Sequence, residues 1–191
     1  MQYQKEEVRV KIITAATEEF ERVGFSKASI IKIAKNSNVP VGNLYRYFKS
    51  KDMLFEAIVK SACDNLPIII ENIYAKDVTL DRNAKEMADI IAFNITEVYK
   101  KYGRQIMILA NMSTGSKYEH YISNLVDSII ELFEKGLYGN INSEHKIMAK
   151  IIGFGFMNGL LTIIKEVPEK NIEEYAKKLI IYYFYQSENR I

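Results

Sequence analysis

Two short amphipathic segments separated by a sharp polar break, residues 29–49, constrain the fold more than any other feature of the chain. Ser29 can cap the first segment, in which apolar residues recur at helical spacing. The break contains Asn38, and Asn tolerates the left-handed backbone that a tight turn between helices needs. Pro40 follows, and its fixed φ suits the start of a new helix. The pattern predicts helix, turn, helix.

The second of these segments has two different faces. Leu44 and Phe48 lie one helical turn apart, so we expect both in the core, with Val39 filling the space beneath the turn. The residues turned outward are Gly42, Asn43 and Arg46. The segment therefore offers an exposed surface on a helix that its hydrophobic face anchors.

Helical periodicity also predicts a supporting helix over residues 5–23, which Gly24 should stop. The chain has only three prolines and nine glycines, and few turn clusters of the kind that bound short strands, so we expect an all-α fold. The next helix is expected over residues 51–74, with a bend near Pro67. Another should begin at a cap, Thr79 or Asp81, and run to Tyr102, with a stop at Gly103. The remaining helices are expected over residues 104–113, 117–137, 143–165 and 168–186.

Charge is distributed unevenly along the chain. Residues 1–53 hold ten Lys and Arg against six Asp and Glu, a net of +4, whereas residues 54–191 hold sixteen against eighteen, a net of −2. The seven basic residues from Arg22 to Lys51 have no acid between them. A basic run is more often a solvated surface, but its overlap with the helix-turn-helix favours a polyanion as partner.

Several classes of protein are disfavoured. Cys63 is the only cysteine, so no disulfide can form within the chain, and the N-terminal residues are too polar for a signal peptide. The longest apolar stretch, residues 151–164, carries Asn158 and is shorter than the roughly 20 residues that span a bilayer. We expect a cytoplasmic protein with no membrane helix.

Residues 24–55, with the sequence GFSKASIIKIAKNSNVPVGNLYRYFKSKDMLF, resemble the DNA-binding region of the tetracycline-repressor (TetR) family. The residues that carry the resemblance, in the family's order and spacing, are Gly24, Phe25, Ile33, Ala34, Val39, Gly42, Leu44, Tyr45, Tyr47, Phe48, Lys51 and Leu54. The chain departs from the family pattern at Ala28, Asn38 and Pro40, where the family usually has Thr, Gly and Ser. These changes keep the backbone geometry but remove hydroxyl groups that could contact a phosphate.

The resemblance implies an N-terminal three-helix helix-turn-helix DNA-binding domain, residues 4–52, and a C-terminal helical ligand-binding and dimerisation domain, residues 53–191. Such a chain would be a transcription regulator, most simply a repressor that binds double-stranded operator DNA as a homodimer and is released by a small-molecule effector. By resemblance, Tyr47 and Lys51 contact phosphates on either side of the groove, and Ser29 meets a neighbouring phosphate.

The outward face of the second segment supplies the candidates for base recognition, because the major groove admits one α-helix. Asn43 can pair with an adenine edge, and Val41 can touch a thymine methyl group. Tyr45 can offer its ring or hydroxyl to a base or phosphate, and Gly42 allows close backbone approach. Two plainer interpretations stay open: Val41 could pack inward, and Tyr45 and Tyr47 could be half-buried aromatic residues.

An effector site is predicted mainly from the resemblance. Asn94 and Asn111 interrupt apolar runs, and a buried amide needs a hydrogen-bond partner that a ligand could provide. The other candidate ligand-binding residues are Phe93, Met107, Met112 and Phe133. The alternatives are amides that are satisfied within the protein and methionines that only fill the core.

The last two predicted helices are the candidate dimer interface. Glycines at 153, 155 and 159 allow close helix packing. The apolar and aromatic residues of the final helix are Ile172, Tyr175, Leu179, Tyr182, Tyr183 and Tyr185. Because one subunit does not easily bury so large a surface, we predict a four-helix interface with a second copy, with an intrachain core as the alternative.

No catalytic or metal-binding set is recognisable. His120 and His145 lie on separate helices without other ligands at metal-binding spacing, so we expect neither an enzyme nor a cofactor or metal site. Two other functions stay open. One is a DNA-binding regulator without a small-molecule inducer, and the other is a helical small-molecule-binding protein with a degenerate DNA-binding motif.

Overall fold

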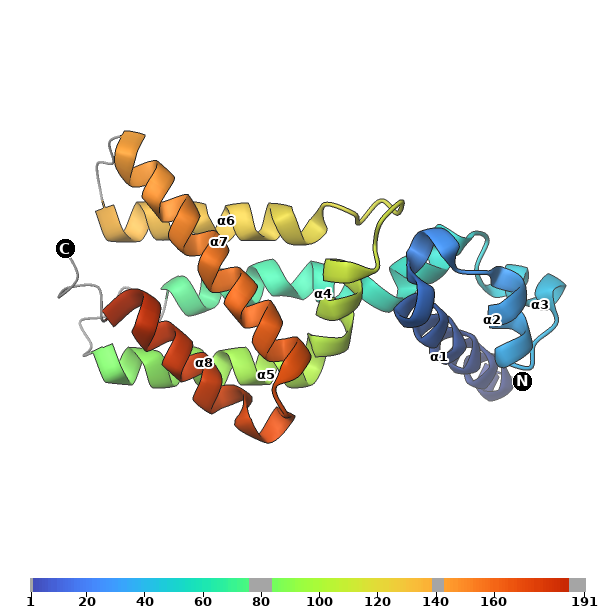
Figure 1. Ribbon diagram of the computed structural model, residues 1–191. Coiled ribbons are helices and arrows are strands. Elements are labelled where there is room, and N and C mark those ends of the chain that lie inside the picture. The colour runs from blue at the N-terminus through green and yellow to red at the C-terminus, as the bar shows by residue number, and fades with distance from the viewer. Residues whose placement is uncertain (1, 76–83, 139–142, 186–191) are drawn as a thin grey trace. The chain divides into compact units, whose positions relative to one another are not determined.

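The computed structural model describes residues 2–75, 84–138 and 143–185, and within them it contains helices and no strand (Figure 1), which confirms the all-α prediction. The α-helices are α1 (Gln2–Lys27), α2 (Ile30–Asn36), α3 (Val41–Tyr47), α4 (Lys51–Ile73), α5 (Ala84–Asn111), α6 (Tyr121–Tyr138), α7 (Ser143–Glu166) and α8 (Ile172–Ile180). A 3-10 turn, η2 (Glu169–Asn171), precedes α8, and a π-helical turn, η3 (Ile181–Tyr185), follows it.

The chain forms two compact units. The first comprises Met1–Asp64 together with Gln105–Ile122, and the second comprises Asn65–Arg104 together with Ser123–Ile191. The end of α5 and the turns that follow it therefore belong to the same unit as the helix-turn-helix. The functional division into residues 4–52 and 53–191 stays a prediction.

Aromatic side chains form the core of the first unit. The Phe55 ring packs edge-on against Phe20, with ring centroids 5.0 Å apart, and against Phe25 at 5.2 Å. Gly24 breaks the helical geometry of α1 with φ 76° and ψ 165°, as the sequence predicts. This break lets Phe25 turn inward, so the two parts of α1 on either side of Gly24 and the start of α4 meet in one cluster.

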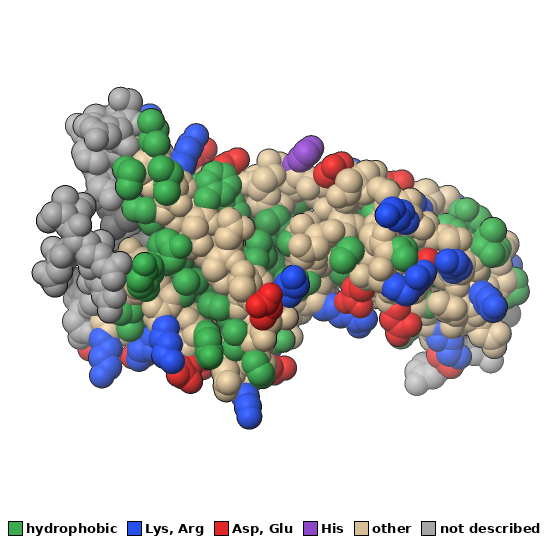
Figure 2. Space-filling view, viewed as in Figure 1, with side chains coloured by type: hydrophobic (Ala, Val, Ile, Leu, Met, Phe, Trp, Pro, Cys, Tyr) green, Lys and Arg blue, Asp and Glu red, His purple; other side chains and the backbone are tan. Residues whose placement is uncertain are grey.

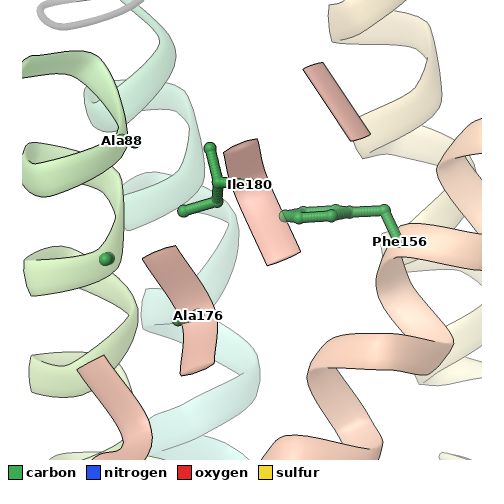
Figure 3. Close-up of a cluster of buried hydrophobic side chains, with 5 residues drawn as sticks. Ala88, Phe156, Ala176 and Ile180 are labelled. Atoms are coloured by element: carbon green, nitrogen blue, oxygen red, sulfur yellow. The ribbon is translucent and has the colours of Figure 1, made fainter. Parts of the chain in front are cut away.

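In the second unit, α8 packs between α5 and α7 (Figure 3). The buried cluster consists of Ala88, Ala92, Phe156, Ala176 and Ile180, and Figure 3 shows the Phe156 ring pointing from α7 toward α8. Small residues on α5 and α8 let these helices approach closely, and the large side chains fill the space that remains.

Two of the α7 glycines serve this packing. A Cβ atom at Gly155 would lie 2.7 Å from the Tyr183 hydroxyl, and one at Gly159 would lie 2.9 Å from a Leu179 methyl group. The glycines therefore allow close packing, as predicted, and their neighbours belong to the same chain. Leu179 and Tyr183 are consequently part of an intrachain contact rather than wholly available to a partner.

The predicted helix end at Gly103 is wrong, because α5 continues without interruption to Asn111. Gly103 is buried, and a Cβ atom there would lie 2.8 Å from the Tyr99 ring. The glycine makes room for an aromatic ring one turn earlier and does not adopt the left-handed conformation of a helix stop.

Other boundaries differ by a few residues. Helix α6 begins at Tyr121 rather than at residue 117, because hydrogen bonds from Ser116 N to Ser113 O and from Glu119 N to Ser116 O form successive turns. Pro168 opens the last helical region, as predicted, but as the 3-10 turn η2. The predicted caps at Thr79 and Asp81 and the predicted end at residue 186 lie outside the described residues.

Candidate nucleic-acid interface

The turn between α2 and α3 has the geometry that the sequence predicts. Ser29 caps α2, since its side chain accepts a hydrogen bond from the Lys32 N–H at 3.5 Å. Asn38 has φ 54°, in the left-handed region. Val39 is buried beneath the turn, and its N–H donates to Ala34 O at 3.0 Å. Local residue choices thus set the angle between α2 and α3.

Helix α3 buries one face and exposes the other. Leu44 is completely buried and Phe48 nearly so, which confirms the predicted inner face. Tyr45 is 43% exposed, and nothing lies within 4 Å of a Cβ atom built at Gly42. The outer face is therefore open along the first two turns of the helix.

The remaining α3 candidates lie at the edges of that open face. Val41, Asn43 and Tyr47 are partly exposed. Neither Val41 nor Asn43 is buried in the core, so both side chains remain accessible to a molecule that lies against α3. Whether each of them touches DNA stays a prediction.

Lys51 differs from the other candidates, because its ammonium group has partners within the chain. Nζ donates to Phe25 O at 2.8 Å, to Ser26 O at 3.2 Å and to Ala28 O at 3.4 Å. It also lies 4.5 Å from the centre of the Phe25 ring. The ammonium group thus binds carbonyl groups at and just after the end of α1, where few backbone N–H groups follow to bind them. Phe25 O also accepts the Ala28 N–H, at 3.3 Å.

Sequence reasoning missed Glu19, a buried acid beside the helix-turn-helix. Glu19 is only 3% exposed, and its Oε2 accepts hydrogen bonds from Arg22 Nη2 at 2.6 Å and Nε at 3.2 Å. Its Oε1 accepts a longer bond, 3.5 Å, from the Ser29 N–H. The Arg22 hydrogen bond, helped by the Ser29 N–H, holds the pKa of Glu19 below its usual value although burial raises it. The spacing of Glu19 and Arg22, three residues apart on one helix, was the available signal.

The turns after α5 were also missed as part of this unit. Phe25 N donates to Met112 O at 2.8 Å, and Ser26 Oγ donates to Thr114 O at 2.5 Å. Lys117 forms an ion pair with Glu56 of α4, with 2.8 Å between Nζ and Oε2. Since the first partners are almost 90 residues apart, no local pattern could have identified them.

Lys and Arg side chains are spread over the visible face of the N-terminal unit, with Asp and Glu among them (Figure 2). In the run from Arg22 to Lys51, the exposed members are Arg22, Lys27, Lys32, Lys35, Arg46 and Lys49. Arg22 has its acidic partner in Glu19, whereas Lys51 bonds backbone carbonyls. The positive field therefore comes chiefly from side chains that surround the α2–α3 pair.

The candidate ligand-binding residues are divided between the two units. Phe93 and Asn94 belong to the second unit, and Met107, Asn111 and Met112 belong to the first. Phe93 is exposed, and the Phe133 side chain lies outside the described part of the chain.

Both asparagine amides bond to their own helix. Asn94 Nδ2 donates to Ile90 O at 2.9 Å, and Asn111 Nδ2 donates to Met107 O at 3.3 Å. Asn94 also lines an open cavity of about 360 Å³, together with Ile69, Val98, Tyr102 and three charged residues of α5. The Tyr102 hydroxyl is buried and has no hydrogen-bond partner among the described residues.

Residues 12–58 match the family model for bacterial regulatory proteins of the tetR family. The matched region contains α2, the turn and α3, so the resemblance to the tetR family that the sequence predicts is confirmed there. Over 59 residues it is 39% identical to the HTH-type transcriptional regulator UidR of Escherichia coli (strain K12), a match that covers 31% of this chain and 30% of UidR.

Solved structures resemble the chain over nearly its whole length. SCO3833 of Streptomyces coelicolor A3, a member of the TetR transcriptional regulator family, superimposes with a TM-score of 0.68 at 14% identity and covers 91% of this chain and 89% of its own. The transcriptional regulator FadR of Bacillus subtilis, solved in complex with stearoyl-CoA, gives 0.52 at 18% identity and covers 92% and 99%. At such identities the likeness concerns the fold alone, and it includes the C-terminal helices.

Proposed function

We propose that the protein is a sequence-specific DNA-binding transcriptional regulator rather than an enzyme, and that it acts in the cytoplasm as a repressor. The observation that carries this proposal is the open outer face of α3 on a helix whose inner face, Leu44 and Phe48, is anchored in the core. The tetR-family match spans this same region. An accessible helix on a rigid support is what readout of the major groove requires.

In this proposal α3 enters the major groove with its first two turns. Asn43 reads an adenine edge, Val41 touches a thymine methyl group, and Tyr45 contacts a base or phosphate. Gly42 lets the backbone approach closely. Tyr47 contacts a phosphate at one side of the groove and Ser29 a neighbouring phosphate, and both set the position of α3 without reading sequence. The family resemblance assigns the phosphate at the other side to Lys51.

A homodimer follows from the exposed apolar surface of the second unit. Ile147, Ile151 and Phe154, spaced four and three residues apart on α7, are all exposed. Tyr175 of α8 and Tyr182 of the following turn η3 are exposed as well. Figure 2 shows hydrophobic side chains gathered over these two helices. A second copy placed on this surface would bury it and would present two α3 helices to a near-palindromic site.

Helix α7 is long and apolar enough to cross a membrane. Within the described residues, Lys146–Glu166 is the one segment of which this is true, and 22% of its most apolar stretch is buried. This is weak evidence for a membrane span, because interface helices of soluble proteins share the property. A protein partner on α7 explains the exposed stripe without a bilayer.

Release by a small-molecule effector is the second part of the proposal. FadR, which shares the fold, was solved in complex with stearoyl-CoA. In this chain the unpartnered Tyr102 hydroxyl supports a ligand in the second unit, since buried hydroxyl groups usually have a partner. A ligand that favours one conformation of the dimer would shift the spacing of the two α3 helices.

A regulator without a small-molecule inducer is the other candidate. It is favoured by Asn94 and Asn111, because each amide nitrogen already donates to a carbonyl group of its own helix. On this view the C-terminal helices only dimerise or answer to a protein partner.

Titration of a fluorescent duplex from the region upstream of the gene tests the proposal. We expect tight binding that weakens steeply with salt and that is much weaker on a duplex of unrelated sequence. Equal affinity for both duplexes would contradict sequence-specific regulation. Addition of a metabolite panel to the complex then separates the candidates, because release by one compound supports an effector and survival against all of them supports the regulator without one.

A further inference from the structure

The last residues of α1 after the Gly24 break, together with Ala28, form a segment, residues 25–28, that the α4 residue Lys51 holds. We call this segment the α1–α2 corner. All three donors of the Lys51 ammonium group have a carbonyl acceptor in the corner within 3.4 Å. An ammonium group has no further donor, so a DNA phosphate could bind Lys51 directly only at the expense of one of these bonds.

The turns after α5 hold the same corner through other atoms. Met112 O accepts the Phe25 N–H, and Thr114 O accepts the Ser26 hydroxyl. Gly115 has φ 83°, and a Cβ atom there would lie 2.6 Å from Ser26 Oγ, so only glycine fits this approach without a shift. The corner ends at the residue before Ser29, the N-cap of α2.

We propose that Lys51 is a positioning residue: it fixes the α1–α2 corner and thereby the start of α2, and it does not bind a DNA phosphate. This assigns Lys51 a different role from the one that the family resemblance implies. The cation closes the carbonyl end of α1, where the helix dipole is negative, and its contact with the Phe25 ring adds to the attraction. The inference rests on the proposed function, because it concerns how the DNA-binding surface is placed.

The experiment compares Lys51→Met, Lys51→Arg and a matched control, Lys49→Met, in the full-length chain. Lys49 is exposed and lies two residues away, so its substitution removes the same charge from the same region. Operator affinity is measured across a salt series, and thermal unfolding is followed without DNA.

If Lys51 positions the corner, Lys51→Met lowers the unfolding temperature by about 4 °C or more relative to Lys49→Met, as loss of charged hydrogen bonds predicts. Affinity falls about tenfold, but the slope of log K against log salt stays equal to that of the control. Lys51→Arg keeps the charge and still loses affinity, because the planar guanidinium is larger than the ammonium group that fits among three carbonyls.

A phosphate contact predicts the opposite set of results. Lys51→Met would then reduce the slope of log K against log salt by about 0.9 more than the control does, and it would leave the unfolding temperature unchanged. Lys51→Arg would retain most of the affinity. That outcome would overturn the inference.

Ser26→Ala keeps the test decisive if the Lys51 variants do not fold. It loosens the other side of the corner without a change of charge, so we expect weaker operator binding with an unchanged salt slope. Unchanged affinity in this variant would count against control by the corner. If the wild-type chain binds no operator, the proposed function fails, whereas the unfolding data still decide whether Lys51 holds the corner.

Discussion

Asn43 and Leu44 are neighbours in the chain, but their environments are opposite. Leu44 is completely buried, whereas Asn43 lies at the edge of the open α3 face. Successive helical residues point about 100° apart, so one position can anchor the helix while the next faces a partner. A substitution at each position should therefore affect a different property.

We expect Asn43→Ala to weaken operator binding by about 1–3 kcal/mol, because a bidentate contact to a base contributes that much discrimination. The unfolding temperature should not change. Anisotropy titrations with operators altered one base pair at a time would measure the effect, and discrimination should be lost at one position in each half-site. Leu44→Ala is the contrast: it should cost about 2–5 kcal/mol of folding free energy. If Asn43→Ala lost the same affinity for every duplex, whatever its sequence, Asn43 would not recognise a base.

Glu19 gives the first unit a specific response to acid. Its pKa is lowered in the folded state by the hydrogen bond from Arg22, so the ionised form stabilises the fold. That contribution is complete above the unfolded-state pKa, near 4.5, and is lost as the pH falls through the lower folded-state value.

We expect Glu19→Gln to lower the free energy of unfolding by about 1–2 kcal/mol at neutral pH, since it loses the charged hydrogen bonds to Arg22. The difference from the wild-type chain should begin to shrink below about pH 4.5, where the unfolded-state carboxylate takes up a proton, and should disappear once the pH falls below the lower folded-state pKa. Urea unfolding at a series of pH values measures this, with the exposed neighbour Glu18→Gln as control. Parallel pH profiles for wild type and Glu19→Gln would disprove the role of Glu19.

At the scale of elements, the turns after α5 depend on one glycine in a way that α3 does not. Gly115 has φ 83° and lies against Ser26, whereas Gly42 is helical with open space around it. The first glycine is needed by the fold of the unit, and the second is needed only by a partner that approaches α3.

Gly115→Ala should destabilise the first unit by about 1–2 kcal/mol, because an L-residue in the left-handed region is strained and its Cβ would displace the Ser26 hydroxyl from Thr114 O. Gly42→Ala is the matched change. It should leave stability equal or raise it by up to about 1 kcal/mol through helix propensity, while weakening operator binding. Chemical unfolding and DNA titration of both variants would show the contrast. Two variants with the same effects on stability and binding would contradict this division of roles.

At the scale of the whole molecule, the proposed homodimer would cover the exposed apolar surface of α7 and α8. Ile151 is 59% exposed in the middle of the α7 stripe, and Ile68 is exposed to a similar extent, 56%, on α4. Because both residues are exposed isoleucines, the same substitution at each position tests whether α7 forms a specific interface or whether any exposed apolar residue has the same effect.

Ile151→Glu should convert the protein to a monomer, because a buried charge without a partner is costly at an apolar interface. Operator affinity should fall with it, since a single α3 helix binds only half of the site. Sedimentation velocity measures the assembly state, and Ile68→Glu should remain dimeric. A dimeric Ile151→Glu variant would show that the interface lies elsewhere.

Sequence alone determined the local features of the DNA-binding region. The Ser29 cap, the left-handed Asn38 and the buried Leu44 were all predictable, because each depends on backbone preferences and on spacing within about one helical turn. The tetR-family motif reinforced them, since it records the same local requirements.

Only the tertiary structure decided the features that depend on distant partners. Gly103 looks like a helix stop in sequence, but it lies inside α5, where the absence of a side chain makes room for the Tyr99 ring. Lys51 looks like a phosphate ligand, but carbonyl groups more than 20 residues away bind its ammonium group. A local pattern specifies which conformations a residue can adopt, whereas packing of segments that are far apart in the chain selects the partner that it meets.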